Sequence, residues 1–170
     1  MAKLISVLAI LVALSACSGK KEEEVYVLPE KAEFLLASDT LKTWKIAKRY
    51  NGKARMNMEP EGCFIKYKQT FFANDSVIDN NEQHFDCGPS LKGTWEITQS
   101  AKGHSYIKLS SSLLPELLGT DKDYKYFKIL YLSKDSLTLS FSHTQYGKKR
   151  TITDYLVRDD LDIGDRSFHY

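Results

Sequence analysis

The sequence predicts a mainly β domain: an eight-stranded antiparallel up-and-down barrel with one or two short helices and a disulfide bond. Three observations lead to this fold class. About eight short segments alternate apolar and polar residues with a period of two, which is typical of half-buried strands. Short polar turns join the segments without helical crossovers, as expected for antiparallel neighbours. Closure into a barrel hides both edges of such a meander, and a β-sandwich is the alternative.

The strands are predicted in chain order from the residues on their apolar faces. These residues are Trp44 and Ile46; Cys63, Ile65, Tyr67 and Phe71; Val77–Phe85, interrupted by Asp79-Asn80-Asn81; Trp95 and Ile97; Ile107 and Leu109; Phe127–Leu132; Leu137, Leu139 and Phe141; and Thr151–Val157. Turn signals such as Asn51-Gly52 and Asn74-Asp75-Ser76 separate them. Helices are expected at Lys31–Ala37 and at Leu113–Leu118, and the second is expected to cover a barrel end.

Length and composition favour one globular domain. The chain has 170 residues, of which 42% are hydrophobic and 27% charged, so collagen-like, coiled-coil and low-complexity classes are excluded. Its 24 basic and 22 acidic side chains give a net charge of +2, without the clustered basic face that nucleic acid requires. The densest basic run, Lys148-Lys149-Arg150, is expected at a hairpin tip, and contact with anionic headgroups or glycans is the alternative.

The first residues have the organisation of a bacterial export signal. Met1–Lys3 is a short positive segment, and Leu4–Ala16 is apolar apart from two serines. This run is too short for a membrane-spanning helix, which needs about 20 apolar residues. Leu14-Ser15-Ala16-Cys17 resembles the bacterial lipobox. Residues 1–16 are therefore predicted to be a lipoprotein signal peptide. The resemblance implies cleavage before Cys17, a diacylglycerol thioether on its sulfur and acylation of the new amino terminus; an ordinary secretory peptide is the alternative.

A lipidated Cys17 is expected to anchor the chain, because two or three acyl chains hold a protein firmly in a membrane. Residues 17–37 are then predicted to be a flexible tether, residues 38–158 the barrel and residues 159–170 a C-terminal tail. Ser18, rather than an aspartate, after the cysteine indicates outer-membrane sorting by analogy with enterobacteria. The acidic run Glu22-Glu23-Glu24 after two lysines resembles the export signal of Bacteroidetes surface lipoproteins. The periplasmic and cell-surface faces both stay open.

The three cysteines divide into one plus two. Once Cys17 carries lipid, Cys63 and Cys87 remain, and an even pair in an oxidising compartment predicts a disulfide. The two are expected near the start of one strand and just after the next, where antiparallel partners return to register. Closing this loop is worth about 3.5 kcal/mol in the chain-entropy model.

One set of motifs is specific through its order and spacing. The motifs are Leu41-Lys42-Thr43-Trp44-Lys45-Ile46, Cys63, Phe71 with Asn74-Asp75, Cys87, Gly93-Thr94-Trp95-Glu96-Ile97, Ile107, and Leu130–Leu139 around Asp135. Together they resemble the lipocalin-like lipoprotein domains that are widespread in Bacteroidetes. The resemblance covers nearly all of Leu41–Val157 and implies a small barrel of largely unassigned role. The segment Arg158–Tyr170 lies beyond this pattern.

The sequence lacks the motifs of common catalytic sites, so an enzyme is not expected. Gly-x-Ser-x-Gly, glycine-rich phosphate loops, His-Glu-x-x-His and Cys-x-x-Cys do not occur. Four histidines stand apart on different predicted turns and strand ends, as solvated or structural side chains do. Asp75, Asp79, Asn81 and Glu82 could supply oxygen ligands to a hard cation, but they lack EF-hand spacing and are ordinary turn residues. No cofactor or metal is therefore expected.

Three tripeptides resemble the O-glycosylation acceptor pattern of exported Bacteroidetes proteins. They are Asp39-Thr40-Leu41, Asp75-Ser76-Val77 and Asp135-Ser136-Leu137, with Thr40, Ser76 and Ser136 as the acceptors. Because Asp-Ser is also common in turns, a purely structural role stays open.

Two functions fit this fold. The first is a non-catalytic binding module whose barrel accepts a small apolar or amphipathic ligand. Its expected ligand contacts are Trp44, Tyr67, Trp95, Tyr131 and Phe141, with Arg55 as a polar anchor. The second is an envelope interaction or structural protein, because aromatic and aliphatic side chains can fill an eight-stranded barrel completely. The expected partners are the membrane, through the lipid, and either a small hydrophobic ligand or an envelope protein, but not nucleic acid.

Overall fold

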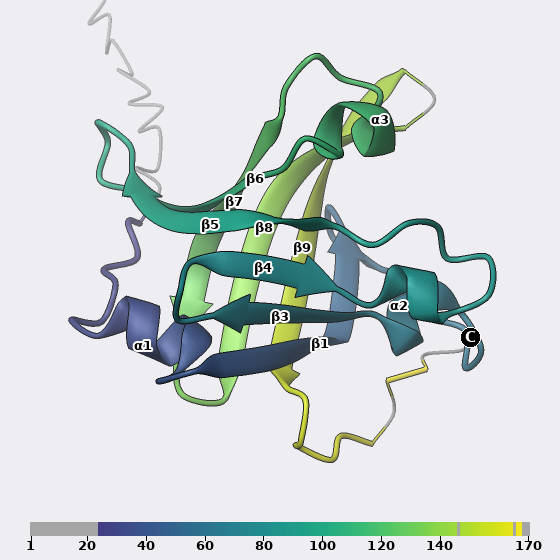
Figure 1. Ribbon diagram of the computed structural model, residues 1–170, viewed down its shortest axis with the longest axis horizontal. Coiled ribbons are helices and arrows are strands. Elements are labelled where there is room, and N and C mark those ends of the chain that lie inside the picture. Colours follow the sequence, from purple (N-terminus) through teal and green to yellow (C-terminus); the bar gives the residue numbers. More distant parts are fainter. Residues whose placement is uncertain (1–23, 146, 165, 168–170) are drawn as a thin grey trace, which may run out of the picture.

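Eight antiparallel strands close into a barrel in the computed structural model, which describes residues 24–145, 147–164 and 166–167 (Figure 1). Each barrel strand pairs with the next along the chain, and the first also pairs with the last. The barrel strands are β1 (Leu41–Asn51), β3 (Lys68–Phe72), β4 (Ser76–Asp79), β5 (Lys92–Gln99), β6 (Ser105–Ser110), β7 (Tyr124–Leu132), β8 (Ser136–Gln145) and β9 (Lys148–Arg158). The predicted up-and-down barrel is confirmed, and the β-sandwich is excluded.

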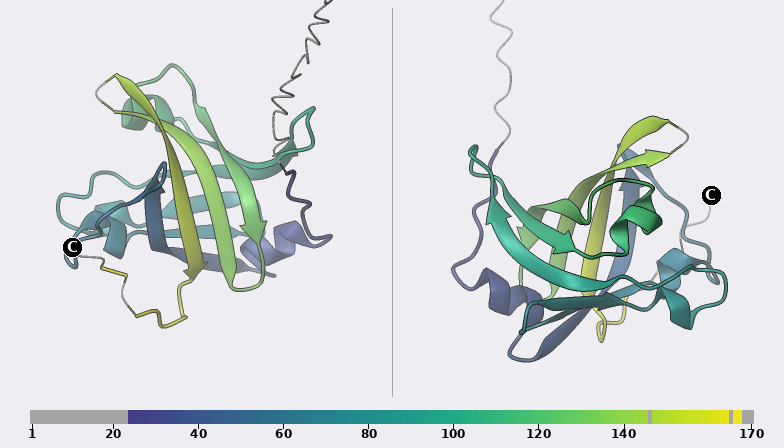
Figure 2. Two further views of the ribbon diagram at one scale, coloured as in Figure 1. Left: turned by 180° about the vertical axis from the view of Figure 1, so that it is seen from behind. Right: turned by 45° about the horizontal axis from the view of Figure 1, so that its top comes forward.

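The remaining elements are short. β2 (Ala54–Arg55) returns along the end of β1, with Tyr50 opposite Arg55. The helices are α1 (Ala32–Ala37), α2 (Cys63–Lys66), α3 (Leu114–Leu118) and the 3-10 helix η1 (Asn81–Gln83). α1 lies at the opposite end of the barrel from α2 and α3 (Figures 1 and 2). The two helices expected from the sequence correspond to α1 and α3.

The inward faces of the strands form one apolar core. Trp44 on β1 is completely buried, and its indole N–H donates a hydrogen bond of 2.9 Å to the Leu36 carbonyl. The indole N–H of Trp95 donates to the Phe72 carbonyl at 3.0 Å. Phe71 meets Trp95 edge to face, with ring centroids 5.8 Å apart. Other core residues are Ile46, Val77, Ile107, Leu109, Ile129, Leu137, Leu139 and Leu156.

The N-terminal cover of the barrel begins earlier than the sequence indicated. Leu36 and Ala37 of α1 are buried in the core. The Tyr26 hydroxyl donates to the Leu132 carbonyl and accepts from the Leu132 N–H, both at 3.0 Å. The prediction of a flexible tether up to residue 37 was therefore wrong for Tyr26 and α1, since apolar side chains at a barrel end gain free energy by being covered. Residues 17–23, with Cys17, lie outside the described residues.

The segment that contains Cys63 is helical rather than extended. α2 begins at Cys63, and the following strand, β3, begins only at Lys68. The Tyr67 N–H donates to the Cys63 carbonyl at 2.8 Å, which closes a helical turn. The expectation that Cys63 and Ile65 lie on a strand was therefore wrong, because this turn satisfies the local backbone before the sheet begins.

Asn80 divides the segment that was predicted as one strand, Val77–Phe85. β4 ends at Asp79, η1 follows, and Phe85 is 97% exposed. The Asn80 side chain accepts from the Lys68 N–H at 2.7 Å and donates to the Lys66 carbonyl at 3.0 Å. These bonds take the place of strand pairing, so the chain turns away from the sheet at this residue.

The described part of the C-terminal tail packs against the barrel. The Asp159 carboxylate forms an ion pair with Lys68 at 2.8 Å. Arg166 donates from Nε to the Ile46 carbonyl and from Nη2 to the Ile65 carbonyl, each at 2.8 Å. Within residues 159–164 and 166–167, the predicted tail is thus tied to β1, α2 and β3.

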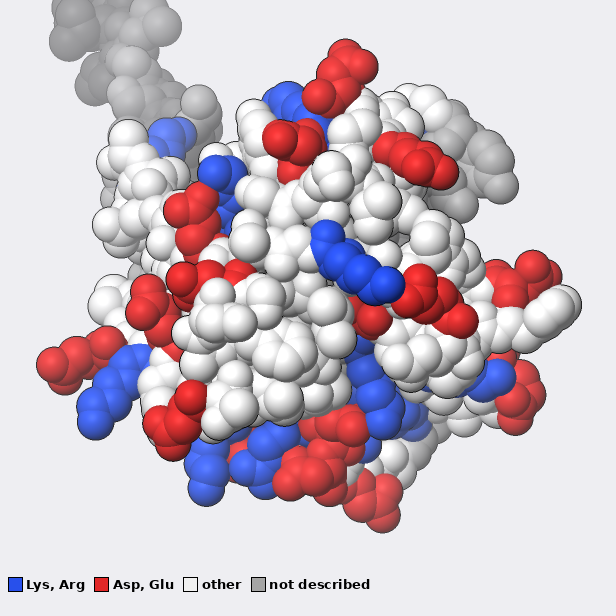
Figure 3. Space-filling model, in the orientation of Figure 1, with Lys and Arg blue, Asp and Glu red and all other residues white. Residues whose placement is uncertain are grey.

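Charged side chains of both signs are mixed on the face shown in Figure 3. Ion pairs such as Lys108–Glu96, with a contact of 2.7 Å, join neighbouring strands on the outer wall. Exposed pairs of this kind contribute about 0–1 kcal/mol each. Lys148-Lys149-Arg150 is exposed at the start of β9 in the β8–β9 hairpin, as predicted.

The described residues contain a complete folding unit. All barrel strands, the three α-helices, η1, Cys63 and Cys87 lie between residues 24 and 167. The β1–β9 pairing closes the sheet, so none of the barrel strands is left as an open edge. A unit with its own core and closed hydrogen bonding folds on its own. Residues 24–170 therefore suffice for measurements in solution.

Candidate ligand cavity

A partly open cavity of about 460 Å³ lies in the barrel at the end that carries α2 and α3. Its size falls in the range of roughly 300–1,000 Å³ that is usual for small-molecule sites. Apolar side chains from the strands and α3 form most of its wall: Leu91, Leu109, Leu114, Leu117, Leu118, Phe127, Leu139, Phe141 and Leu156. A hollow of about 520 Å³ on the outer surface is lined by Lys68, Thr70 and Ile78 instead, so volume alone does not select the site.

An ion pair crosses the cavity wall between β1 and β9. The register of these strands places Arg49 opposite Asp154. Arg49 donates from Nε and Nη2 to the two carboxylate oxygens of Asp154, both at 2.6 Å. Their side chains are 15% and 8% exposed. The Arg49 guanidinium also lies over the Phe64 ring, 4.3 Å from its centroid. Both ends of the carboxylate are therefore occupied by one guanidinium.

Lys125 brings a second cation into the same cavity. It lies on β7 two residues before Phe127, so both side chains are on the inner face of the strand. The Lys125 Nζ is 5.3 Å from the centroid of the Phe127 ring. Nζ is 4.5 Å from the centroid of Phe141 on β8. Burial lowers the pKa of Lys125, and the positive charge of Arg49 acts in the same direction, whereas Asp154 opposes it. The ammonium thus rests on aromatic faces in a poorly solvated position.

Tyr67 and Asp79 add polar groups to the opposite wall. Burial raises the pKa of the Tyr67 phenol, and the negative charge of Asp79 adds to this effect, so the phenol is a hydrogen-bond donor at neutral pH. Burial also raises the pKa of Asp79, although hydrogen bonds from the Asn81 backbone and the Ser90 side chain favour its charged form. The cavity therefore combines apolar walls with a few polar groups at fixed places.

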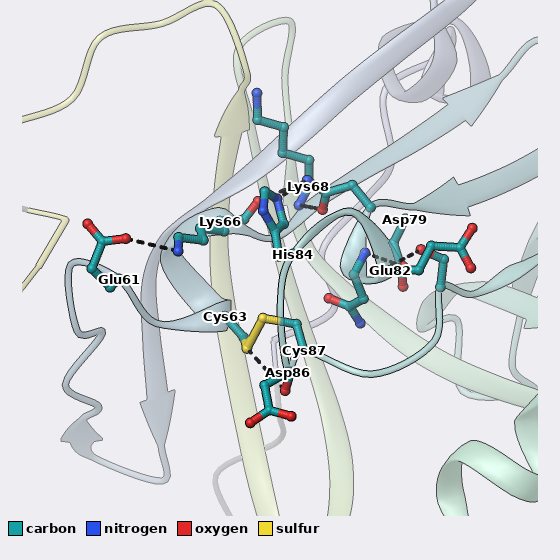
Figure 4. The surroundings of a disulfide bond; sticks show 12 residues. Glu61, Cys63, Lys66, Lys68, Asp79, Glu82, His84, Asp86 and Cys87 are labelled. Atoms are coloured by element: carbon teal, nitrogen blue, oxygen red, sulfur yellow. Dashed lines mark hydrogen bonds and ion pairs between the residues drawn. A yellow bond between two sulfur atoms is a disulfide. The ribbon is translucent and has the colours of Figure 1, made fainter.

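Cys63 and Cys87 both line the cavity at its rim, and Figure 4 shows the disulfide that joins them. It joins the start of α2 to the segment after η1, across a sequence separation of 24 residues. Beside it, Lys66 pairs with Glu61 at 2.9 Å. The Asn80 amide lies 3.0 Å from the His84 ring nitrogen. The predicted disulfide is confirmed, and it holds two rim segments together.

The six predicted ligand contacts fall in three different places. Tyr67 and Phe141 line the cavity. Trp44 and Trp95 are buried in the core and do not line it. Tyr131 lies on the outer wall, 48% exposed, and packs against Tyr26 with centroids 6.0 Å apart, because a register shift after Ile129 changes the parity of β7. Arg55 lies on β2, away from the cavity lining.

Sequence reasoning missed the polar residues of the cavity wall, although a signal for two of them exists. These residues are Arg49 on β1, Gln69 on β3, Asp79 on β4, Lys125 on β7 and Asp154 on β9. Gln69 and Asp154 stand between apolar neighbours two residues away on both sides, whereas Arg49 is inward because a register shift follows Ile46. A charged or amide side chain at an inward position is uncommon unless it is paired or faces a cavity. The alternation around Gln69 and Asp154 would therefore have indicated polar groups inside the barrel, but not Arg49 or the position of the cavity.

The three predicted glycosylation acceptors lie at strand starts or turns. Thr40 is exposed directly before β1. Ser76 and Ser136 are half-buried at the starts of β4 and β8. The Ser76 hydroxyl donates to the Asn74 side chain at 2.6 Å, which is ordinary turn chemistry. O-glycosylation at these residues stays a prediction.

The described residues bring together no group of three or more His, Cys, Asp or Glu side chains that could hold a metal ion. In the same part of the chain, no helix combines the length and the apolar character that a membrane crossing demands.

Replacing Arg49 by methionine is expected to lower the free energy of unfolding by about 2 kcal/mol, because Asp154 loses both of its hydrogen bonds. Because the cavity that the pair lines is partly open, solvent can reach the carboxylate left behind, and the loss is expected to stay below the roughly 3–5 kcal/mol of fully buried pairs. Urea unfolding of residues 24–170 measures the difference. Lys48→Met, at an exposed position of the same strand, is the control. Equal stability of the two variants would contradict a structural role for the ion pair.

In comparisons with known proteins, no family model, curated protein or solved structure matches this chain. The sequence motifs, the barrel and the residues of the cavity are therefore the features that bear on its function.

Proposed function

We propose that the protein is a non-catalytic binding module that holds a small apolar or amphipathic ligand in the barrel cavity. The observation that carries this proposal is the cavity of about 460 Å³, whose walls are mainly leucine and phenylalanine side chains. A few polar groups, including the Arg49–Asp154 pair, interrupt these walls. Concave apolar sites with a small number of placed polar groups are typical of small-molecule binding.

The proposal includes a place of action. A lipid on Cys17 would hold the barrel at a bacterial outer membrane, on its periplasmic or its external face, as in the lipocalin-like lipoproteins that the sequence resembles. The Cys63–Cys87 disulfide supports an exported protein, because such bonds persist in oxidising compartments.

An envelope interaction protein is the second candidate. Exposed aromatic side chains on the outer wall favour it, since Tyr126 is 46% exposed and Tyr131 is 48% exposed. This candidate was expected to have a barrel filled completely by side chains. The cavity at the α2–α3 end is evidence against such a filled barrel. We therefore place ligand binding first.

Binding of a neutral apolar fluorophore tests the proposal. N-phenyl-1-naphthylamine is expected to bind residues 24–170 saturably, in a one-to-one complex. Leu117→Trp adds a large side chain at a residue that lines the cavity, and it is expected to weaken binding about tenfold, or 1.4 kcal/mol. Glu116→Trp adds the same side chain at an exposed position of the same helix and should leave the affinity unchanged.

Two results would overturn ligand binding in the cavity: no saturable fluorescence change, or equal affinities of the two tryptophan variants. Native mass spectrometry of the protein from its own host gives an independent readout. A non-covalent adduct of lipid size supports the binding module, whereas a bare barrel that co-purifies with an envelope protein supports the second candidate.

A further inference from the structure

The charged groups that act on Lys125 do not neutralise its positive charge. Its charged neighbours are Arg49 and Asp154, and the two atoms that Asp154 can offer are both bonded to Arg49. Within the described residues, the Lys125 ammonium has ring faces as neighbours, but no carboxylate or carbonyl oxygen accepts from it. The pKa of His143 is lowered by burial and by the same two cations, so this imidazole is neutral at pH 7 and leaves the count unchanged. The cluster of Arg49, Asp154 and Lys125 therefore carries one positive charge in excess. Asp79 also lines the cavity, on the opposite wall, but it is not among the charged groups that act on Lys125.

Neutral hydrogen-bond donors face the same cavity. The Tyr67 hydroxyl and the Gln69 amide line it, and neither has a hydrogen-bond partner within the described part of the chain. The Tyr67 phenol lies within the electrostatic reach of Asp79, Arg49 and Asp154, and the last two also act on Lys125. Neither the Tyr67 hydroxyl nor the Gln69 amide is among the fully buried polar atoms without a partner, so both keep accessible surface in the cavity, where a ligand oxygen can accept hydrogen bonds from them.

The remaining wall suits an alkyl chain. Leucines of α3 and of β6, β8 and β9 surround the space next to Lys125 and Phe127. An amphiphile could therefore place its chain against these leucines and its head among the polar groups. A cationic head would meet the excess positive charge, and a neutral head would leave that charge without a partner.

We infer that the ligand of this cavity is an anionic amphiphile, whose carboxylate, phosphate or sulfate head pairs with the ammonium of Lys125. This inference rests on the proposed binding function and narrows its ligand class. The anion supplies the missing charge, and its oxygens accept the charge-assisted hydrogen bonds that Lys125 has no protein group to receive. Because burial lowers the pKa of Lys125, the site disfavours an uncompensated cation, and a bound anion relieves that penalty.

Three amphiphiles with one alkyl chain and different heads test the inference: dodecanoate, dodecanol and dodecyltrimethylammonium. Each competes with N-phenyl-1-naphthylamine on residues 24–170. Dodecanoate is expected to bind about tenfold more tightly than dodecanol, and the cation more weakly than both. Lys125→Met should abolish the preference for dodecanoate, and Lys125→Arg should retain it. Lys128→Met is the matched control, because Lys128 lies on the outer face of the same strand. This variant should behave as the parent protein.

The outcomes separate this inference from the proposed function. If all three amphiphiles displace the fluorophore equally, or if Lys125→Met keeps the preference for dodecanoate, the anionic head is wrong and the binding module stands. If the fluorophore does not bind and no amphiphile changes the melting temperature, both proposals are wrong. Cooperative unfolding of each variant establishes that a lost preference does not come from a lost fold.

Discussion

Replacing Trp44 by alanine is expected to lower the free energy of unfolding by about 4 kcal/mol. The indole is completely buried among the core side chains of the barrel. Its N–H also donates to the Leu36 carbonyl at 2.9 Å, which fastens α1 to β1. The substitution therefore opens a cavity in the core and removes the partner of a buried carbonyl. Urea unfolding of residues 24–170, followed by circular dichroism, measures the loss.

Two further variants show which part of Trp44 is responsible. Trp44→Phe keeps most of the apolar volume but removes the N–H, so its loss is expected to be about 1–2 kcal/mol. Tyr126→Ala removes an aromatic ring from the outer wall and should cost about 1 kcal/mol, because that ring makes edge contacts with Tyr106 and Tyr124. A Trp44→Ala variant no less stable than Tyr126→Ala would refute the central place of Trp44 in the core.

Removal of the disulfide is expected to have the second largest effect. The bond closes a loop of 24 residues, and the chain-entropy model assigns about 3.5 kcal/mol to a loop of this length. Reduction and the double substitution Cys63→Ser/Cys87→Ser should each lower the free energy of unfolding by about this amount. The loop contains β3, β4 and η1, so most of its residues belong to the barrel wall or the cavity rim.

Residues 24–170 contain Cys63 and Cys87 but not Cys17, so an effect of reductant on this segment belongs to one bond. Urea midpoints with and without reductant give the measurement. The double serine variant is the control, because reductant should not change its midpoint. A parent protein that unfolds at the same urea concentration with and without reductant would show that the bond does not stabilise the fold.

Strand alternation predicted most of the barrel because burial of one face is a local property of an antiparallel strand. Ile107 and Leu109 of β6 are inward and buried, as are Leu137 and Leu139 of β8. The disulfide followed from counting cysteines in a chain that the sequence predicts to be exported. Alternation was misleading at Tyr131, where a register shift reverses the parity, and at Val77–Phe85, where the Asn80 side chain bonds to a neighbouring strand. Both exceptions depend on partners that are distant in sequence.

The cavity could not be located from the chain alone. Arg49 and Asp154 are 105 residues apart in sequence and meet because β1 and β9 close the barrel. The charge of Lys125 is unmatched only because barrel closure brings Arg49 to Asp154, and both carboxylate oxygens of Asp154 then accept hydrogen bonds from Arg49. Aromatic residues were the expected ligand contacts, yet the buried tryptophans fill the core and Tyr131 faces outward. The side chains that decide the ligand class are instead the polar ones at inward positions.

By itself, the sequence determined the class of fold, the pairing of Cys63 with Cys87 and the position of most turns, and it predicts an export signal. These features depend on short segments or on a count of residues, so no long-range contact is needed to infer them. The tertiary structure alone decided which barrel end is covered by α1, which end remains hollow and which charges are left without partners there. Those properties arise only when strands from both ends of the chain close one wall, because burial and charge balance are set by neighbours in space.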